Sequence, residues 1–154
     1  MLAPTLCEQR AFQVLGIQER IDPTRADYRA LWGRFERRAK EVRALATEEA
    51  GYGVYFDCDE SSRSDFVAGM AAARRETVPA GLVLREVPAG TWAVFECTMA
   101  TIGATWEAIL GQWLPASGMD AAEGKPAYER FPPGCHEGAA PVTIHLAVVR
   151  RPVG

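Results

Sequence analysis

Short apolar runs recur along the chain between charged or glycine- and proline-rich segments, and this pattern predicts β-strands. In the last run, apolar and polar residues alternate from Val142 to Leu146, as in a strand with one buried face. The run at 66–72 is interpreted as a strand although it contains alanine, which favours helices. The predicted strands cover residues 11–17, 52–57, 66–72, 82–87, 91–97, 126–131 and 142–149.

Two longer segments repeat apolar residues at steps of three or four, which predicts amphipathic helices packed on a sheet. For the first helix, Asp22 is the expected N-cap, Pro23 the first helical residue and Gly51 the C-cap. For the second, Thr101 is the expected N-cap, and Pro115 is expected to end the helix. The periodic positions are Tyr28, Leu31, Trp32, Phe35, Ala39, Val42 and Leu45, and then Ile102, Trp106, Ile109, Leu110, Trp113 and Leu114.

The order of these elements is strand, helix, strand, strand, then a bridging strand, then strand, helix, strand, strand again. This order predicts an α+β fold built from duplicated β-α-β-β units, with two main helices and an antiparallel sheet. We expect one domain over residues 1–154, with half-repeats at about 8–80 and 81–154. Two such halves can associate about a pseudo-twofold axis, and ligands favour the cleft at such a seam.

Composition narrows the class of protein further. Of 154 residues, 48% are apolar and 24% charged, and the net charge of −3 argues against a general nucleic-acid binder. No apolar run reaches the length of a membrane span, and no secretory signal is recognised, so a cytoplasmic location is expected. Four separated cysteines and two histidines, His136 and His145, form no metal-ligand spacing, so neither a metal nor a cofactor is expected.

The run from Pro126 to Phe131 carries the residue that we consider the functional candidate. Because side chains alternate along a strand, Ala127, Glu129 and Phe131 share one face, and Tyr128 and Arg130 the other. A carboxylate between a small residue and an aromatic ring suits the wall of an apolar cavity, where it would select a ligand. The alternative is an ordinary solvent-facing acid on a strand, since Glu is rarely buried.

Several stretches together resemble the GyrI-like small-molecule-binding domains, the effector-binding modules that occur alone or fused to AraC-type and MerR-type transcription activators. They appear in the family's order over most of the chain, and the family's fold is the duplicated arrangement inferred above. The family often has an acidic residue, a tyrosine and a proline in its last strand, where this chain has Thr143, His145 and Ala147. The stretches that carry the resemblance are 12–17, 31–35, 52–55, 87–95, 113–118 and 128–131.

The resemblance implies a pocket at the seam of the halves that is lined with aromatic rings and holds one acid, which matches Glu129. Such a pocket would suit a lipophilic or cationic aromatic ligand, because aromatic faces add cation–π attraction to the charge of the acid. For the tryptophans, ordinary packing of helix on sheet is the alternative, and Trp92 lies on the strand face opposite Phe95. The expected ligand-binding residues are Glu129, Trp106, Trp113, Phe95, Tyr55, Phe131 and Trp32.

Three functions remain open. The first is a stand-alone effector-sensing or drug-sequestering protein, monomeric or dimeric, that contacts neither nucleic acid nor membrane directly. The second is a hydrolase of cyclopropane-containing xenobiotics, an activity found in some proteins that resemble this family. In that case Glu129 would be the acid, base or nucleophile, and Tyr55 would assist it. The third is a gyrase-inhibitor-like module that contacts a protein partner.

Overall fold

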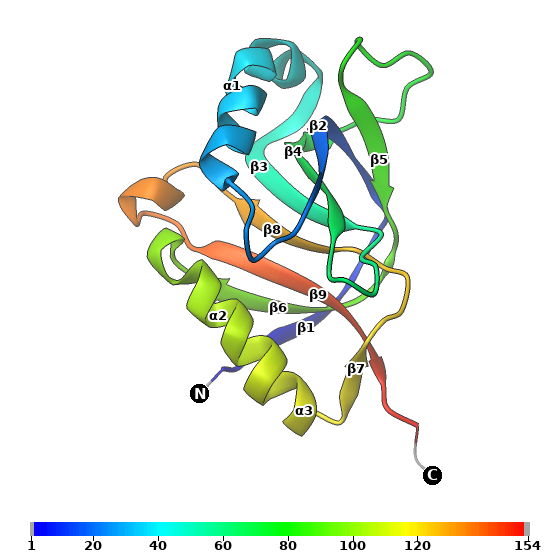
Figure 1. Cartoon of the computed structure of the whole chain (residues 1–154), viewed down its shortest axis with the longest axis vertical. Coiled ribbons are helices and arrows are strands. Elements are labelled where there is room, and N and C mark those ends of the chain that lie inside the picture. Colours follow the sequence, from blue (N-terminus) through cyan, green and yellow to red (C-terminus); the bar gives the residue numbers. More distant parts are fainter. Residues whose placement is uncertain (1, 153–154) are drawn as a thin grey trace.

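The computed structural model describes residues 2–152 as a twisted antiparallel sheet with its helices on one side (Figure 1). The sheet has nine strands in the order β1-β6-β9-β8-β3-β4-β2-β5, with β7 paired to β9 off this path. The strands are β1 (Thr5–Gln9), β2 (Phe12–Ile21), β3 (Ala46–Phe56), β4 (Ser64–Ala72), β5 (Val83–Val87), β6 (Gly90–Cys97), β7 (Met119–Ala121), β8 (Ala127–Phe131) and β9 (Val142–Arg150). The predicted α+β class with an antiparallel sheet and two main helices is confirmed.

The strand order is symmetric about the pairing of β3 with β8. On one side lie β3, β4, β2 and β5, and on the other β8, β9, β6 and β1. Each half therefore ends in a strand from elsewhere in the sequence, because β1 pairs with β6, and β5 pairs with β2. The seam between the halves runs along β3 and β8, where the ligand site was expected.

Helix α1 (Tyr28–Leu45) packs on β2 and β4, and buries Leu31, Phe35, Ala39 and Val42. The second helical segment lies against the other half (Figure 1). It comprises a 3-10 turn (Met99–Thr101), α2 (Ile102–Ala108), a π-helical turn (Ile109–Trp113) and α3 (Leu114–Ala116). A further 3-10 turn covers Cys135–Glu137. Within residues 2–152, none of these helices is both long and apolar enough to cross a membrane.

The predicted N-cap of the second helix, Thr101, is confirmed as the N-cap of α2, whereas both predicted ends of the first helix were wrong. The N-cap of α1 is Asp27, whose carboxylate accepts from the Ala30 N–H at 3.0 Å, whereas Asp22 and Pro23 lie in the preceding loop. The helix ends at Leu45, and Gly51 lies inside β3, where it pairs with Met70. Residues Ala46–Ala50 instead open β3 as an irregular strand, in which Ala46 pairs with Ala72 and the register with β4 shifts before Gly51.

Pro115 does not end the second helical segment, which continues to Ala116. The π-helical turn directly before it places Pro115 in the first turn of α3, where a missing N–H is tolerated. The strands β1 and β7 were not predicted from the sequence.

The face of the sheet opposite the helices forms its own aromatic core. The ring of Phe12 on β2 lies 5.5 Å from the ring of Tyr128 on β8, although β3 and β4 separate these strands. The sheet is therefore strongly curved. On this face His145 stacks on Tyr128, with ring centroids 4.2 Å apart, and Trp92 is fully buried.

Candidate ligand-binding site

Glu129 lies on β8 at the centre of the seam between the two halves. It pairs with Gly53 of β3 on one side and with Ile144 of β9 on the other. Its neighbours Ala127 and Phe131 pack toward α2, while Tyr128 belongs to the core of the opposite face, as the alternation predicted. Only 6% of Glu129 is exposed, so it is not a solvent-facing strand acid.

Two neutral donors hold the carboxylate. Trp106 of α2 donates its indole N–H to Glu129 Oε2 at 2.7 Å, and the Tyr55 hydroxyl lies 3.3 Å from the same oxygen. Trp106 and Tyr55 also contact each other edge to face, with ring centroids 6.3 Å apart. Three of the predicted site residues therefore meet at one point, each from a different element.

Burial raises the pKa of the Glu129 carboxyl, and the bonds from Trp106 and Tyr55 offset only part of this effect. Within residues 2–152, Glu129 forms no ion pair, and the neighbouring Arg130 pairs with Glu48 at 2.8 Å on the opposite face. Burial, together with the nearby carboxylate, also raises the pKa of the Cys97 thiol to about 11. The site therefore combines one acidic group with neutral neighbours.

Gly53 makes room for this arrangement on β3. A Cβ atom there would lie 2.9 Å from Cζ of Phe66 and 3.5 Å from Oε1 of Glu129. Position 53 therefore leaves no room for a side chain between the ring of Phe66 and the carboxylate of Glu129. Sequence reasoning assigned no site role to Gly53 or Phe66.

The other predicted aromatic residues form two pairs beside this centre. Trp32 of α1 and Phe131 of β8 meet across the seam, with ring centroids 5.5 Å apart at 80°. Phe95 of β6 and Trp113 lie 5.0 Å apart on the α2 side, and Phe95 is 2% exposed. The first pair adjoins the seam, whereas the second also fits ordinary packing of helix on sheet.

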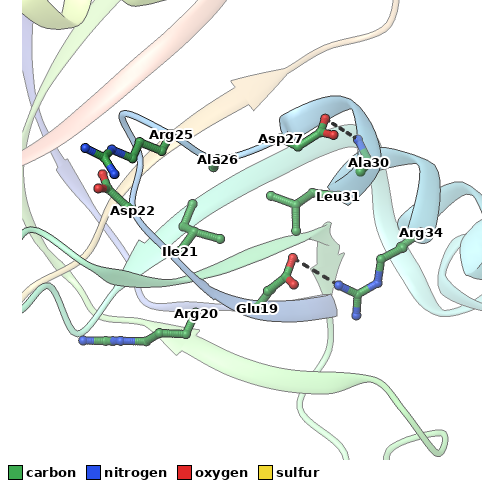
Figure 2. Close-up of a pocket in the computed structure, with 10 residues that line it drawn as sticks. All are labelled: Glu19, Arg20, Ile21, Asp22, Arg25, Ala26, Asp27, Ala30, Leu31 and Arg34. Atoms are coloured by element: carbon green, nitrogen blue, oxygen red, sulfur yellow. Dashed lines mark hydrogen bonds and ion pairs between the residues drawn. The ribbon is translucent and has the colours of Figure 1, made fainter.

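Two hollows open elsewhere on the molecule. One of about 370 Å³ lies between the end of β2 and the start of α1, and is lined by charged residues that include Asp22, Arg25 and Arg34 (Figure 2). A second, of about 360 Å³, lies beside Phe12, Thr47 and Arg74. Neither hollow includes Glu129, which the side chains of Trp106 and Tyr55 cover.

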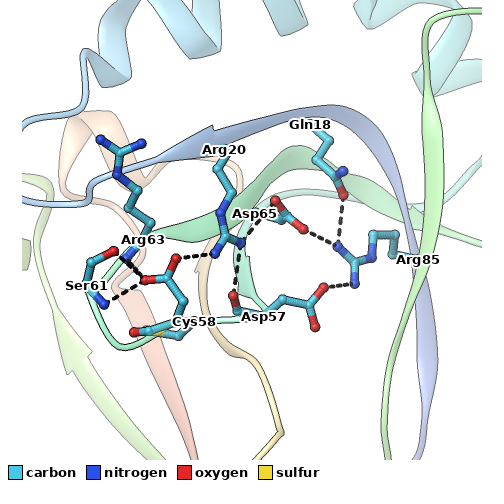
Figure 3. Close-up of polar contacts among 9 residues, drawn as sticks. Gln18, Arg20, Asp57, Cys58, Ser61, Arg63, Asp65 and Arg85 are labelled. Atoms are coloured by element: carbon cyan, nitrogen blue, oxygen red, sulfur yellow. Dashed lines mark hydrogen bonds and ion pairs between the residues drawn. The ribbon is translucent and has the colours of Figure 1, made fainter.

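A charged network ties the β3–β4 connection to β2 and β5 (Figure 3). Arg20 bonds Asp59 and Asp65, and Arg85 bonds Asp57 and Asp65. Hydrogen bonds from Ser61, from the Arg63 backbone and from Arg20 hold the pKa of the Asp59 carboxyl far below its usual range. The residues of this network already bond one another, so we infer that the network holds the β3–β4 hairpin in place.

The family of the chain follows from its sequence profile as a whole. Residues 2–148 match the family model of the GyrI-like small molecule binding domain. The chain belongs to this family. Over 123 residues it is 29% identical to the transcriptional regulator BrlR of Pseudomonas aeruginosa. The aligned region covers 77% of this chain but only 44% of that regulator.

Solved structures with the same fold support the GyrI-like architecture. SAV2435 bound to tetraphenylphosphonium matches with a TM-score of 0.75 at 12% identity, covering 96% of this chain and 94% of that one. The C-terminal domain of EcmrR matches with a TM-score of 0.71 at 15% identity, covering 97% and 99%. A bacterial transcription regulation protein from Staphylococcus aureus matches with a TM-score of 0.71 at 11% identity, and the match covers 96% of this chain and 99% of that one. At these identities the likeness shows the shared fold.

Proposed function

We propose that this GyrI-like domain binds lipophilic cations at the seam of its halves, with Glu129 as the counter-charge. The observation that carries the proposal is a carboxylate only 6% exposed, without a cationic partner in the described chain, held by two neutral aromatic donors. A purely structural acid in such a place would be expected to have an ion-pair partner.

The energetics favour exchange of a proton for a cation. An ionised carboxylate in an apolar surrounding is costly, so the neutral form of Glu129 is favoured more in the site than it would be in water. A cation placed against it restores the charged form. Aromatic faces at Trp106, Tyr55 and Trp32 would each add about 0.5–2 kcal/mol of cation–π attraction once water is excluded.

Glu129 is only 6% exposed, so a ligand can reach it only if a covering side chain moves, such as that of Trp106, which bonds Oε2. The bond is a single one, and α2 is followed directly by the π-helical turn at Ile109–Trp113. Irregular turns of this kind are frequent at functional sites in helices. Large aromatic side chains without directional demands would then accept ligands of varied shape.

The comparisons support this proposal without extending to the ligand of this chain. A protein of the same fold has been solved with a phosphonium cation, and a regulator shares 29% identity with this chain over 123 residues. We infer that the biological role is effector sensing or drug sequestration. The activities and partners of the longer regulator belong to that protein.

The decisive experiment compares ligands of one shape and different charge. Titration with tetraphenylphosphonium is expected to quench tryptophan fluorescence and to give saturable calorimetric binding, whereas tetraphenylborate, the anion of similar shape, should not bind. Glu129→Gln should weaken phosphonium binding at least tenfold, and Glu48→Gln on the opposite face should leave it unchanged. Equal binding of both ions, or phosphonium binding that Glu129→Gln leaves unaltered, would refute the proposal.

A second candidate, the hydrolase, is favoured by one contact. The Tyr55 hydroxyl approaches Glu129 to 3.3 Å, and a carboxyl with a raised pKa can serve as a general acid near neutral pH. Consumption of a cyclopropane-containing compound, followed by mass spectrometry, would support this function if both Glu129→Gln and Tyr55→Phe abolish it. Inhibition of gyrase supercoiling without ligand binding would instead support a protein-interaction role.

A further inference from the structure

The hydroxyl of Tyr55 lies between two acceptors but carries one hydrogen. It is 3.3 Å from Glu129 Oε2 and 3.1 Å from the hydroxyl oxygen of Tyr28. The Tyr28 hydroxyl is itself 3.1 Å from the carbonyl oxygen of Pro23, to which it donates. The three side chains and this carbonyl therefore form one chain of hydrogen bonds that starts at the buried acid.

The charge state of Glu129 decides the direction of this chain. With a neutral carboxyl, Glu129 donates to Tyr55, Tyr55 donates to Tyr28, and Tyr28 donates to Pro23, so every hydrogen has an acceptor. With an ionised carboxylate, Tyr55 must turn its hydrogen to Glu129, and the single hydrogen of Tyr28 can then serve either Tyr55 or Pro23 but not both, so one bond of the chain is lost. The chain is thus complete only when Glu129 is neutral.

We infer that Tyr28 is a positioning residue that competes with Glu129 for the Tyr55 hydrogen and thereby lowers the affinity of the site for cations. The inference rests on the proposed function for its effect on binding, but not for its effect on the acid. It gives Tyr28 a role beyond the helix–sheet packing that the sequence indicates.

Among the described residues, the other elements around Glu129 supply no charge that could override this competition. Trp106 of α2 and Phe66 of β4 are neutral, and the Cys97 thiol of β6 stays protonated. Ile144 of β9 is apolar. The protonation of the acid is therefore set by burial and by the donors that reach it.

The structure fixes the Tyr28 hydroxyl independently of Glu129. Tyr28 is the first residue of α1, and its ring packs against Phe66 with centroids 5.6 Å apart at 80°. Its acceptor Pro23 lies in a loop held by bonds from Thr24 to the Asp22 carboxylate. Removing only the hydroxyl in Tyr28→Phe keeps the ring and its packing.

The test uses three tyrosine-to-phenylalanine variants and two measurements. In ligand-free protein labelled at the Glu carboxyl carbons, the Glu129 titration midpoint is followed by NMR, with the signal assigned by its loss in Glu129→Gln. Tyr28→Phe is expected to lower the midpoint by roughly 0.5–1 pH unit, because Tyr55 then donates to the carboxylate alone. Tyr55→Phe is expected to raise it. Tyr52→Phe, which removes a hydroxyl bonded to Glu48 on the opposite face of the same strand, should leave it unchanged.

Calorimetric titration with tetraphenylphosphonium near the midpoint pH extends the test to binding. Tyr28→Phe should bind roughly 3- to 10-fold more tightly than wild type, and Tyr55→Phe more weakly, which is opposite to the loss expected if Tyr28 were a ligand contact. An unchanged or raised midpoint in Tyr28→Phe overturns the inference. If wild type binds no phosphonium, the proposed function fails, and the NMR arm alone still decides the role of Tyr28.

Discussion

At the scale of single residues, Glu129 combines burial with an ionisable group, and this combination makes stability depend on pH. Its folded pKa is raised above the unfolded value of about 4.3, so the native state binds its proton more tightly than the unfolded state. Wild type therefore loses stability as pH rises through the range between these two pKa values.

We accordingly expect Glu129→Gln to be more stable than wild type at pH 8, with a smaller difference at pH 4, where both side chains are neutral. Urea unfolding at the two pH values measures the change. A difference that is independent of pH, or that grows toward acid, would show that Glu129 does not carry this penalty.

His145 creates the opposite dependence on the other face of the sheet. Burial, and secondly the charge of Arg130, lower its pKa to about 4 from the ordinary 6.5. Because the folded value is depressed, stability is present above pH 6.5 and is lost as pH falls toward 4. The loss amounts to about 3 kcal/mol at most.

In His145→Gln this acid-side loss should be absent, although the variant gives up the stacking on Tyr128 and is expected to be less stable at pH 7. Denaturant unfolding between pH 7 and pH 4 checks the prediction. Parallel curves for wild type and variant would contradict it.

At the scale of elements, β2 and β4 approach each other through glycines. Gly16 and Gly69 are register partners, and a Cβ atom on Gly69 would lie 2.2 Å from the backbone oxygen of Leu15. Since backbone cannot yield as a flexible side chain can, Gly69→Ala is expected to destabilise by about 3 kcal/mol or more. Gly33→Ala, exposed within α1 and with nothing within 4 Å, should stabilise by about 0.5–1 kcal/mol. Thermal and urea unfolding of the two variants measures both changes in stability. A small destabilisation in Gly69→Ala would contradict the close approach of the two backbones.

The elements that could be predicted from the sequence are those whose residues are buried on a regular period or in an unbroken apolar run. Helix α1 shows this, as do the central strands, in which a run such as Phe66–Ala72 is buried throughout. Strand β1, with Thr5, Leu6 and Glu8 exposed, has no such pattern and exists because β6 offers it a pairing edge. The start of β3 was not predicted for the same reason, since Glu48 and Glu49 fit a helix as well as a strand.

The site divides in the same way. Alternation along β8 was sufficient to place Glu129 and Phe131 on one face, and helical spacing placed Trp106 toward the sheet. Tyr28 and Gly53 could not be assigned to the site, because their closeness to Glu129 depends on how α1 packs on the sheet and on the pairing of β3 with β8. That arrangement is tertiary, and no local pattern encodes it.

At the scale of the whole molecule, the exchange of edge strands joins the halves more firmly than the seam alone. The half-repeats are predicted at about residues 8–80 and 81–154. With these bounds, each half-repeat would begin near a strand that pairs in the other half, because β1 pairs with β6 and β5 pairs with β2. The chain therefore crosses between the halves in addition to meeting along β3 and β8. Ring contacts from Trp32 to Phe131 and from Tyr55 to Trp106 add side-chain packing across the same boundary.

Neither half is then expected to unfold alone. Near-UV circular dichroism, tryptophan fluorescence and far-UV circular dichroism should give one coincident urea transition. In native-state hydrogen exchange, the amides of the β3–β8 ladder, such as those of Val54 and Tyr128, should exchange only with global unfolding, whereas those of the edge strand β1 should exchange at lower free energy. Two separated transitions, or ladder amides that open before the rest, would show that the seam is a boundary between independent units. In that case a ligand at Glu129 would act by holding two separate units together, because its contacts come from β3 and β8 on either side of the seam.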